Sequence, residues 1–283
     1  MRIGLLHSTI REDEKLLIDS ARKNNTELEI LDVRGQVFNV ETWQKKYDCL
    51  LLRCISATAG MHASMFFEHL GLPVVSPLQV IAICENKFLT SLKLRNNKVP
   101  TVPFALALSE HEAIEAVNQL GGYPIVLKPV SGSWGRLLAK INDQDALEAV
   151  IEQKNILGSP SHKAFYIQKY INTNGRDIRV TTVGNRVICA IYRDAYHWIT
   201  NTARGARASV CAVDKTLEQI SIAASRAVGG GVLGIDMFET NDGYIVNEVN
   251  HTPEFKNVQR TTEVNVAKAI IDYCHEVANH DGH

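Results

Sequence analysis

The sequence lacks the features that mark membrane-spanning and disulfide-rich proteins. No apolar stretch approaches the roughly 18 residues that a membrane helix needs. The apolar run near the N-terminus is broken at His7, well short of the apolar region of a signal peptide. The six cysteines are scattered and include no Cys-x-x-Cys pair, which leaves zinc and redox motifs unsupported. We interpret them as buried free thiols of a protein in the reducing cytoplasm.

An excess of charge of one sign is also missing. The 30 Lys and Arg residues almost balance the 31 Asp and Glu residues, so nothing global favours nucleic acid or a membrane surface as a partner. A hydrophobic content of 45% with 22% charged residues is typical of a globular protein. Internal repeats and low-complexity tracts are absent. At roughly 100–200 residues per domain, 283 residues predict two or three compact units.

The pattern along the chain divides these units. Residues 2–7, 28–33 and 49–53 form short runs that are apolar at nearly every position, and helical patterns lie between and after them at 12–24 and 60–70. Strands of this kind are expected in a parallel sheet that is covered on both faces. We therefore predict a small doubly wound α/β domain at about 1–85.

The remaining chain mixes strand and helix patterns in a way that favours two further α+β layers, at 86–167 and 168–283. Helices are expected at about 84–96, 110–120, 145–154, 215–228 and 264–277. Strands are expected at about 101–106, 125–129, 137–141, 165–170, 177–183, 187–192, 233–239 and 243–250.

A hairpin near the C-terminus carries the strongest chemical signal. The turn around Asp242 and Gly243 joins two alternating runs, which is a strong hairpin pattern. Glu248 and Asn250 lie two residues apart and so face the same side, and Asp236 can join them if the strands pair in register. Three oxygen donors on one surface suit Mg²⁺. The alternative is a polar strand face exposed to solvent.

A glycine-rich loop follows Lys128 at the end of an apolar strand. Residues 131–136 read Ser-Gly-Ser-Trp-Gly-Arg, so backbone N–H groups can approach an anion closely while the lysine supplies charge. The Gly-Lys-Ser/Thr ending of a Walker loop is missing. A simple turn remains the alternative, although Trp134 between two glycines favours a lid over a bound nucleotide.

Arginine replaces lysine between residues 176 and 207. This segment holds six arginines and two aspartates, with no lysine or glutamate. Arginine is favoured where carboxylate or phosphate is bound through two hydrogen bonds. A solvated strand face is the alternative. Arg193, after an apolar strand, and Arg204, before a glycine, are the best candidates for catalytic groups.

A loop with polar residues directly follows the acidic hairpin. Residues 251–257 read His-Thr-Pro-Glu-Phe-Lys-Asn, at the end of the strand that carries Glu248. Substrate groups are expected to converge on such a loop beside a metal. His251 is a candidate base, with a structural role as the alternative.

Together these motifs resemble the ATP-grasp superfamily, and within it the RimK-like branch of ligases. The resemblance covers essentially the whole chain, and its most specific stretches are 128–137, 175–180, 197–205 and 247–257. It implies three α/β subdomains with ATP clamped between the second and third. It also implies Mg²⁺ ligands at Asp236, Glu248 and Asn250. The expected nucleotide-binding residues are Lys87, Lys128, Gly132, Ser133, Trp134, Gly135, Arg136, Leu138, Gln168, Lys169, Tyr170, Ile171, Asp177 and Arg179.

The sequence departs from the family pattern at two positions. Lys169 stands in the adenine hinge where relatives often have Glu, which leaves backbone contacts possible but puts a side-chain role in doubt. Ile199 stands where RimK-like relatives have an arginine, so Arg193 or Arg204 must supply charge for phosphate.

The resemblance further implies a reaction in two steps. ATP phosphorylates the side-chain carboxylate of the C-terminal glutamate of a small acidic amino-group carrier protein. The α-amino group of 2-aminoadipate then forms an amide during lysine biosynthesis. The expected substrate-binding residues are Arg193, Asn201, Thr202, Ala203, His251, Thr252, Glu254, Phe255, Lys256 and Asn257.

The identity of the amine depends mainly on Asn257, because glutamate-using relatives of the arginine pathway carry Gly-Phe after Glu-Phe-Lys. Those enzymes, bifunctional members and RimK-like protein glutamate ligases remain alternatives, as does a non-catalytic nucleotide-binding or docking module. Family members imply a homo-oligomer, either a dimer or a tetramer.

Overall fold

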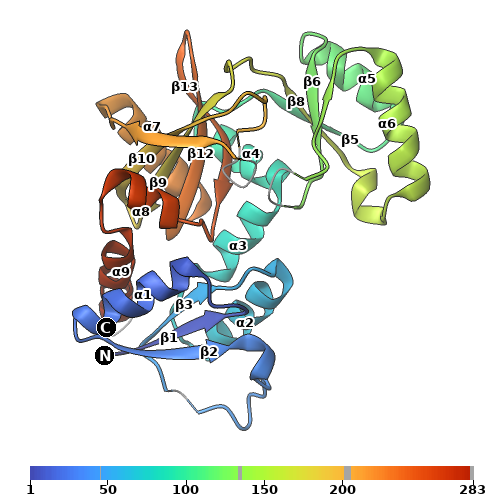
Figure 1. Ribbon diagram of the computed structural model, residues 1–283. Helices are drawn as coiled ribbons and strands as arrows, with labels where there is room; N and C mark the ends of the chain where they lie inside the picture. Colours follow the sequence, from blue (N-terminus) through green and yellow to red (C-terminus); the bar gives the residue numbers. More distant parts are fainter. Residues whose placement is uncertain (45, 133–135, 201–204, 281–283) are drawn as a thin grey trace.

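The computed structural model describes residues 1–44, 46–132, 136–200 and 205–280. These ranges contain three sheets, of four, five and four strands. Figure 1 shows the first sheet at one end of the molecule and the other two sheets side by side at the opposite end. The helices found in the described ranges are all too short or too polar to cross a membrane.

The first sheet is parallel and has the strand order β2-β1-β3-β4. β3 is buried at all five positions, which confirms the expectation from its uniformly apolar sequence. The strands are β1 (Arg2–His7), β2 (Glu27–Asp32), β3 (Cys49–Arg53) and β4 (Val74–Val75), with helices α1 (Glu12–Lys23) and α2 (Ala57–His69) and a short 3₁₀ helix, η1 (Val33–Gly35).

The last helix, α9 (Val266–His280), returns to this first sheet. Its buried residues Ile270 and Cys274 belong to the same core cluster as Ile3 and Leu5 of β1. The same cluster includes Val183 of the five-stranded sheet, so the C-terminal helix packs between two sheets. The predicted division at 1–85, 86–167 and 168–283 stays a prediction.

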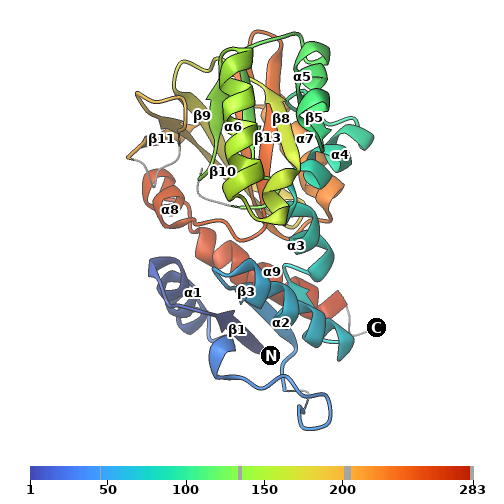
Figure 2. The ribbon, with the colours of Figure 1, turned by 90° about the vertical axis from the view of Figure 1, so that its right-hand side faces the viewer.

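The second four-stranded sheet is antiparallel, with the order β5-β8-β6-β7. Figure 2 shows its helices α5 and α6 lying over it. Its elements are β5 (Phe104–Ala107), β6 (Ile125–Lys128), β7 (Ala139–Ile141), β8 (Phe165–Lys169), α5 (Glu110–Gln119), α6 (Gln144–Leu157) and a short 3₁₀ helix, η2 (Pro160–Lys163). β6 ends at Lys128, so the lysine lies at the C-terminal end of this inner strand, as its sequence context predicts.

The five-stranded sheet is antiparallel throughout and has the order β11-β10-β9-β12-β13. Helix α7 has the predicted bounds and packs against this sheet. The elements are β9 (Arg176–Val183), β10 (Arg186–Asp194), β11 (Arg207–Cys211), β12 (Val232–Thr240), β13 (Gly243–Asn250), α7 (Lys215–Val228) and α8 (Lys256–Thr262).

The hairpin of β12 and β13 pairs as the sequence predicts. Thr240 pairs with Gly243 at the turn, and Asp236 lies directly opposite Glu248. The register shifts between Asp236 and Met237, so Asn247 is left out of the ladder. A bulge of this kind redirects a side chain beside a site, and Asn247 indeed meets Lys128 of the other sheet.

The start of the helix expected at 84–96 is wrong, because residues 84–96 are divided between two helices in the structure. α3 (Leu78–Glu85) ends before Asn86, and α4 (Lys87–Asn96) begins after it. Asn86 has an extended backbone, and its side chain accepts a hydrogen bond from the backbone N–H of Leu89, which is N-cap geometry. The break places Glu85 and Lys87 at adjoining helix ends.

Three other elements differ from the expected pattern. β5 begins at Phe104 rather than at 101, because the backbone of Val102 and Pro100 bonds to Val246 of β13 instead. β11 was not anticipated. Neither was α8. The backbone N–H groups of Phe255 and Lys256 at its start donate hydrogen bonds to Oδ1 of Asp13, more than 240 residues earlier in the chain.

Candidate active site

Two cavities meet beside the acidic hairpin. The first, which we call the sheet cavity, lies between the two antiparallel sheets and is lined by Lys128, Gln168 and Asp236, among others. The second, the junction cavity, lies where α1, α3 and the loop after β13 come together, and is lined by Arg11, Glu85 and His251, among others. Arg193 and Glu248 line both cavities, so these two residues mark the boundary between them.

A buried network of charged side chains lies at this boundary between the two cavities. Arg179 donates to both carboxylate oxygens of Asp236, through Nε and, at 3.0 Å, through Nη2. The Nη2 atom of Arg193 lies 3.0 Å from Oδ1 of Asp236 and 2.5 Å from Oδ2 of Asp177. Thr200 Oγ1 also donates to Asp177, at 2.6 Å. The network therefore links strands β9, β10 and β12 in one rigid unit.

The ionisation states in this network follow from its pairing. Burial alone would raise the pKa of Asp236, but the charges of Arg179 and Arg193 lower it below its usual value. Burial alone would likewise lower the pKa of Arg193, but Asp236 and Asp177 raise it. Asp236 and Arg193 are thus held in their ionised forms by their partners, whereas burial raises the pKa of Asp177 despite its pairing with Arg193.

Two lysines approach Glu248 from different elements. Nζ of Lys87 lies 3.1 Å from Oε1 of Glu248 and donates to the carbonyl of Gly132 at 2.5 Å. Nζ of Lys128 donates to Oδ1 of Asn247 at 3.0 Å. Burial lowers the pKa of Lys128 to about 8, and its hydrogen-bond partner Asn247 is a neutral amide rather than a carboxylate. The arrangement offers two ammonium groups to an anion.

The donor set at the hairpin is compatible with a divalent cation. Asp236 and Glu248 occupy paired positions, and Asn250 follows on the same strand. An ionised carboxylate has about four lone-pair sites, and the three hydrogen bonds to Asp236 leave Oδ2 with capacity for one further ligand. No cluster of three or more His, Cys, Asp or Glu side chains occurs within the described ranges. A metal here must therefore draw on Asn250 and on groups outside the protein.

The sheet cavity is also lined by the predicted hinge residues Gln168, Lys169, Tyr170 and Ile171. Leu138, another of the expected nucleotide-binding residues, lines it as well. Gln168 is 1% exposed, and its Nε2 atom has no hydrogen-bond partner within the described part of the chain. A buried donor without a partner costs free energy unless a ligand accepts from it.

An aromatic side chain that the sequence did not single out also lines the sheet cavity. Trp198 packs edge-on against Tyr170, with 6.3 Å between the ring centroids. Aromatic and apolar side chains beside the unpaired amide of Gln168 suit a planar heterocycle.

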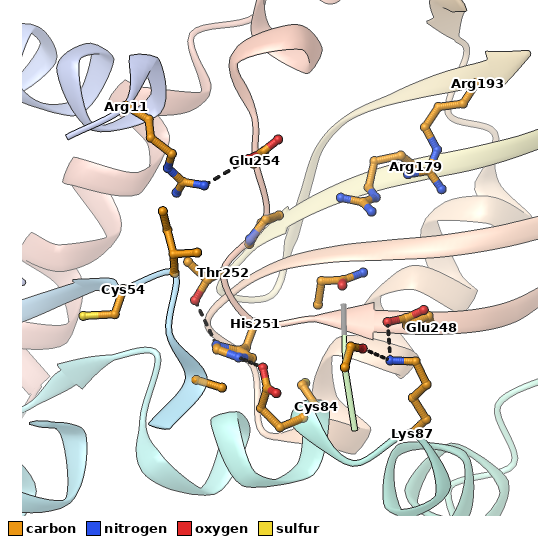
Figure 3. Close-up of a pocket in the computed structure, with 16 residues that line it drawn as sticks. Arg11, Cys54, Cys84, Lys87, Arg179, Arg193, Glu248, His251, Thr252 and Glu254 are labelled. Atoms are coloured by element: carbon orange, nitrogen blue, oxygen red, sulfur yellow. Dashed lines mark hydrogen bonds and ion pairs between the residues drawn. The ribbon is translucent and has the colours of Figure 1, made fainter. Parts of the chain in front are cut away.

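The junction cavity is shown in Figure 3. His251 Nε2 lies 2.9 Å from Oε1 of Glu85, and His251 Nδ1 lies 2.9 Å from Oγ1 of Thr252. The hydrogen bond with His251 lowers the pKa of Glu85. Both imidazole nitrogens thus have partners, which fixes the ring orientation. On the other side of the same loop, Oε1 of Glu254 accepts from Nη1 of Arg11 at 3.0 Å.

Several predicted site residues do not line either cavity. Phe255 is fully buried in the core that joins the first sheet and the five-stranded sheet. Lys256 and Asn257 lie in the first turn of α8, and Arg136 is exposed in a turn. The substrate contacts of 255–257 and the nucleotide contact of Arg136 stay predictions. Ser133, Trp134, Gly135, Asn201, Thr202, Ala203 and Arg204 lie outside the described residues.

Sequence reasoning missed two residues on the junction side and one on the sheet side. Arg11 and Glu85 carry no motif and lie far in the chain from their partners, and Thr200 of the sheet cavity was not singled out within the stretch 197–205. A weak signal existed for Glu85 alone, because it directly precedes the capping residue Asn86.

Comparisons with known proteins agree with this geometry. Residues 3–83 match the LysX preATP-grasp domain family, and residues 84–274 match the RimK-like ATP-grasp domain family. The alpha-aminoadipate–LysW ligase LysX of Saccharolobus solfataricus is 35% identical, over 93% of this chain and 96% of that protein. The glutamate–LysW ligase ArgX of Sulfurisphaera tokodaii is 32% identical, over 98% and 99%.

Solved structures show the same fold. The RimK domain ATP-grasp protein of Sphaerobacter thermophilus superposes with a TM-score of 0.80 at 21% identity, covering 96% of this chain and 99% of that one. The predicted fold class, an α/β ATP-grasp architecture, is thereby confirmed. The chain therefore belongs to the RimK-like ATP-grasp family of ATP-dependent carboxylate–amine ligases, preceded by a pre-ATP-grasp domain of the LysX type.

Proposed function

We propose that this protein joins the α-amino group of 2-aminoadipate to the side-chain carboxylate of the C-terminal glutamate of the carrier protein LysW, in lysine biosynthesis. The carboxylate oxygen attacks the γ-phosphorus of ATP, and ADP leaves. The amine then attacks the acyl carbon, inorganic phosphate leaves, and an amide bond remains.

One observation carries the proposal: Arg193 and Glu248 line both cavities. A ligase of this kind must bring a nucleotide and an acceptor together at one reacting centre. The sheet cavity offers a buried free donor for a base and Lys128 for phosphates, and Lys87 lies beside Glu248 at the boundary of the two cavities. The junction cavity opens on the other side of Glu248, where an acceptor can approach.

The side chains fit a mechanism of positioning and electrostatic stabilisation. Lys87 and Lys128 bind the phosphates. Asp236, Glu248 and Asn250 hold Mg²⁺, which neutralises charge on the transferred phosphoryl group. Arg193 positions the carboxylate of Asp236 and, with Arg204, is the proposed source of positive charge near the acyl phosphate. No protein nucleophile is needed for these steps.

Fewer observations support 2-aminoadipate as the amine substrate than support the type of reaction. Asn257 follows Glu254, Phe255 and Lys256, as in the lysine-pathway form, and the LysX relative is slightly more similar than the ArgX relative. The alternatives are a glutamate-using ligase, a bifunctional ligase and a RimK-like protein glutamate ligase.

The carrier is proposed to be the acidic LysW, and the setting a reducing cytoplasm. All six cysteines lie in the described ranges, where they are free and buried. We also propose a dimer or a tetramer, which light scattering of the purified protein tests directly.

The experiment measures ADP release with Mg²⁺, ATP and each amino acid, using LysW and a LysW variant that lacks its C-terminal glutamate. We expect turnover with 2-aminoadipate only when the intact carrier is present. Glu248→Gln should lower turnover at least about a hundredfold without changing the fold, because Glu248 is partly exposed. Turnover independent of the carrier, or an active Glu248→Gln variant, would overturn the proposal.

A further inference from the structure

Arg11 presents a fixed guanidinium group to the junction cavity. It is the residue before α1, and its Nε and Nη2 atoms donate to the two oxygens of Glu14 at 3.1 and 3.0 Å. Glu14 is fully buried and also accepts from Nε of Arg53 at 3.1 Å. Burial alone would raise the pKa of Glu14, but the hydrogen bond from Arg11 and the charge of Arg53 lower it. The guanidinium of Arg11 is therefore held in place by a partner that stays ionised.

The remaining edge of that guanidinium has an exchangeable partner. Nη1 of Arg11 donates to Oε1 of Glu254 at 3.0 Å. The side chain of Glu254 is 38% exposed, and within the described ranges it makes no other hydrogen bond or ion pair. An ion pair with this exposure is worth little in water. A ligand carboxylate of the same geometry can take the place of Glu254 at small cost.

The junction cavity has cationic groups on two sides. In Figure 3, Arg11 lies on one side of the loop that carries Thr252, and Lys87, Arg179 and Arg193 lie on the other. Arg179, Arg193 and Lys87 are paired with carboxylates of the reaction centre. Arg11 differs from these three cations because one of its two carboxylate partners, Glu254, lies on a partly exposed loop. Such a cavity suits an acceptor with a carboxylate at the end remote from its reacting amine.

We propose that Arg11 is a specificity-determining residue that binds the distal carboxylate of the incoming amino acid, which displaces Glu254. This inference rests on the proposed function, because it concerns the amine substrate of the same reaction. It assigns a role to the LysX-type pre-ATP-grasp domain, since Arg11 lies within residues 3–83. Glu254 then keeps the guanidinium paired until substrate arrives.

The test compares amino acids that differ only at the far end. Purified enzyme with Mg²⁺-ATP and the carrier is assayed with 2-aminoadipate and with norleucine, which has the same chain length but no distal carboxylate. Arg11→Gln should lower kcat/KM for 2-aminoadipate by about 10- to 100-fold, the usual range for a hydrogen bond to a charged group. Activity with norleucine and the KM for ATP should not change. An equal loss for both amino acids would show a structural role and overturn the proposal.

A matched control lies on the same pair of helices. Arg260 of α8 pairs with Glu12 of α1 at 2.6 Å, and Arg260 does not line the junction cavity. Arg260→Gln removes an arginine–glutamate pair between these helices and should leave selectivity unchanged. If it reproduces the effect of Arg11→Gln, the role of Arg11 is in packing rather than in recognition.

Glu254→Gln tests the displacement itself. Removing the competing charge should lower the KM for 2-aminoadipate by about two- to fivefold, as expected from an exposed ion pair. A rise in KM instead would mean that Glu254 helps to bind the substrate, and would overturn the displacement. If Arg11→Gln raises the KM for the carrier but not for the amino acid, the carboxylate belongs to the carrier's terminal glutamate.

Failure of this inference can be told apart from failure of the proposed function. If wild-type enzyme forms no amide with the carrier, the proposed function fails. Calorimetric binding of 2-aminoadipate in the presence of a non-hydrolysable ATP analogue, without carrier, still compares wild type with Arg11→Gln. Equal affinity of the two proteins would overturn the role of Arg11.

Discussion

Two ion pairs occupy consecutive positions of the ladder between β9 and β10, and they differ in their exposure to solvent. Asp177 pairs with Arg193, and the next position pairs Arg176 with Asp194. The first pair is almost fully buried, with side chains 4% and 7% exposed, whereas the second is 52% and 37% exposed. Successive strand residues face opposite sides. The same pairing of arginine with aspartate therefore lines the sheet cavity on one face and forms a solvated surface on the other.

Burial also changes what each pair does. Arg193 bridges Asp177 and Asp236, so it is the central cation of a network that positions a proposed metal ligand. Arg176 donates a hydrogen bond to Asp194 and lies over the ring of Tyr192, and about half of its side chain is exposed to solvent. Removing one charge from the buried network leaves another without a partner, whereas water can replace either member of the exposed pair.

The largest expected effect comes from reversing each pair. The double substitution Asp177→Arg with Arg193→Asp places a carboxylate beside Asp236. We expect this variant to show no measurable ligation and to unfold at a temperature well below that of the wild type. Arg176→Asp with Asp194→Arg should keep activity within about twofold. Circular dichroism melts and the ligation assay make the comparison. An active protein with the buried pair reversed would contradict the role of Asp236 in the network.

A single truncation gives a smaller but better-defined effect. Arg193→Met should lower the free energy of unfolding by about 3–5 kcal/mol, the usual cost of breaking a buried pair. Arg176→Met should cost less than about 1 kcal/mol. Urea unfolding of both variants measures the difference. Equal costs would mean that burial does not separate the two pairs.

Lys128 extends the comparison to a buried cation without a carboxylate in hydrogen-bond contact. Its pKa of about 8 lies below the ordinary lysine value, so the ammonium is lost as pH rises through 8. Phosphate binding needs the charged form. The Kd for ATP should therefore rise above pH 8, by about tenfold per pH unit at most. In the absence of ligand the sign is opposite, because the unfolded chain binds more protons between pH 8 and the ordinary lysine pKa, so that stability rises with pH there. A Kd that stays constant to pH 9.5 would contradict the assignment.

The smallest expected effect concerns the exposed face alone. Arg207 lies at the start of β11 and is exposed. If this face steers an acidic carrier, Arg207→Gln should lower kcat/KM for the carrier by about threefold at low ionic strength and not at high ionic strength. A loss that does not depend on salt would point to a direct contact instead.

The difference between the two faces explains what the sequence could predict. Period-two geometry and the Asp242-Gly243 turn correctly paired Asp236 with Glu248, since both signals are local. Lys128 at the end of β6 and the bounds of α7 were predicted for the same reason. The arginine-rich segment was recognised, but its residues could not be sorted into buried and exposed groups without the sheet order.

The rest of the site depends on contacts that no local pattern encodes. Arg11 and Glu254 are 243 residues apart, and the break at Asn86 depends on a side-chain cap that competes with helix continuation. The residue that caps α8 lies in α1 rather than beside α8. Tertiary structure decides such features, so local motifs led to Lys128, Gln168 and His251 but not to Arg11 or Glu85.

Intact-mass analysis of the carrier tests the central claim most directly. LysW is incubated with the enzyme, Mg²⁺, ATP and equal concentrations of 2-aminoadipate and glutamate. The account predicts one new species, heavier than LysW by 2-aminoadipate less one water, formed only when the carrier retains its terminal glutamate. ADP formation with an unmodified carrier, or a carrier that gains only glutamate, would contradict it.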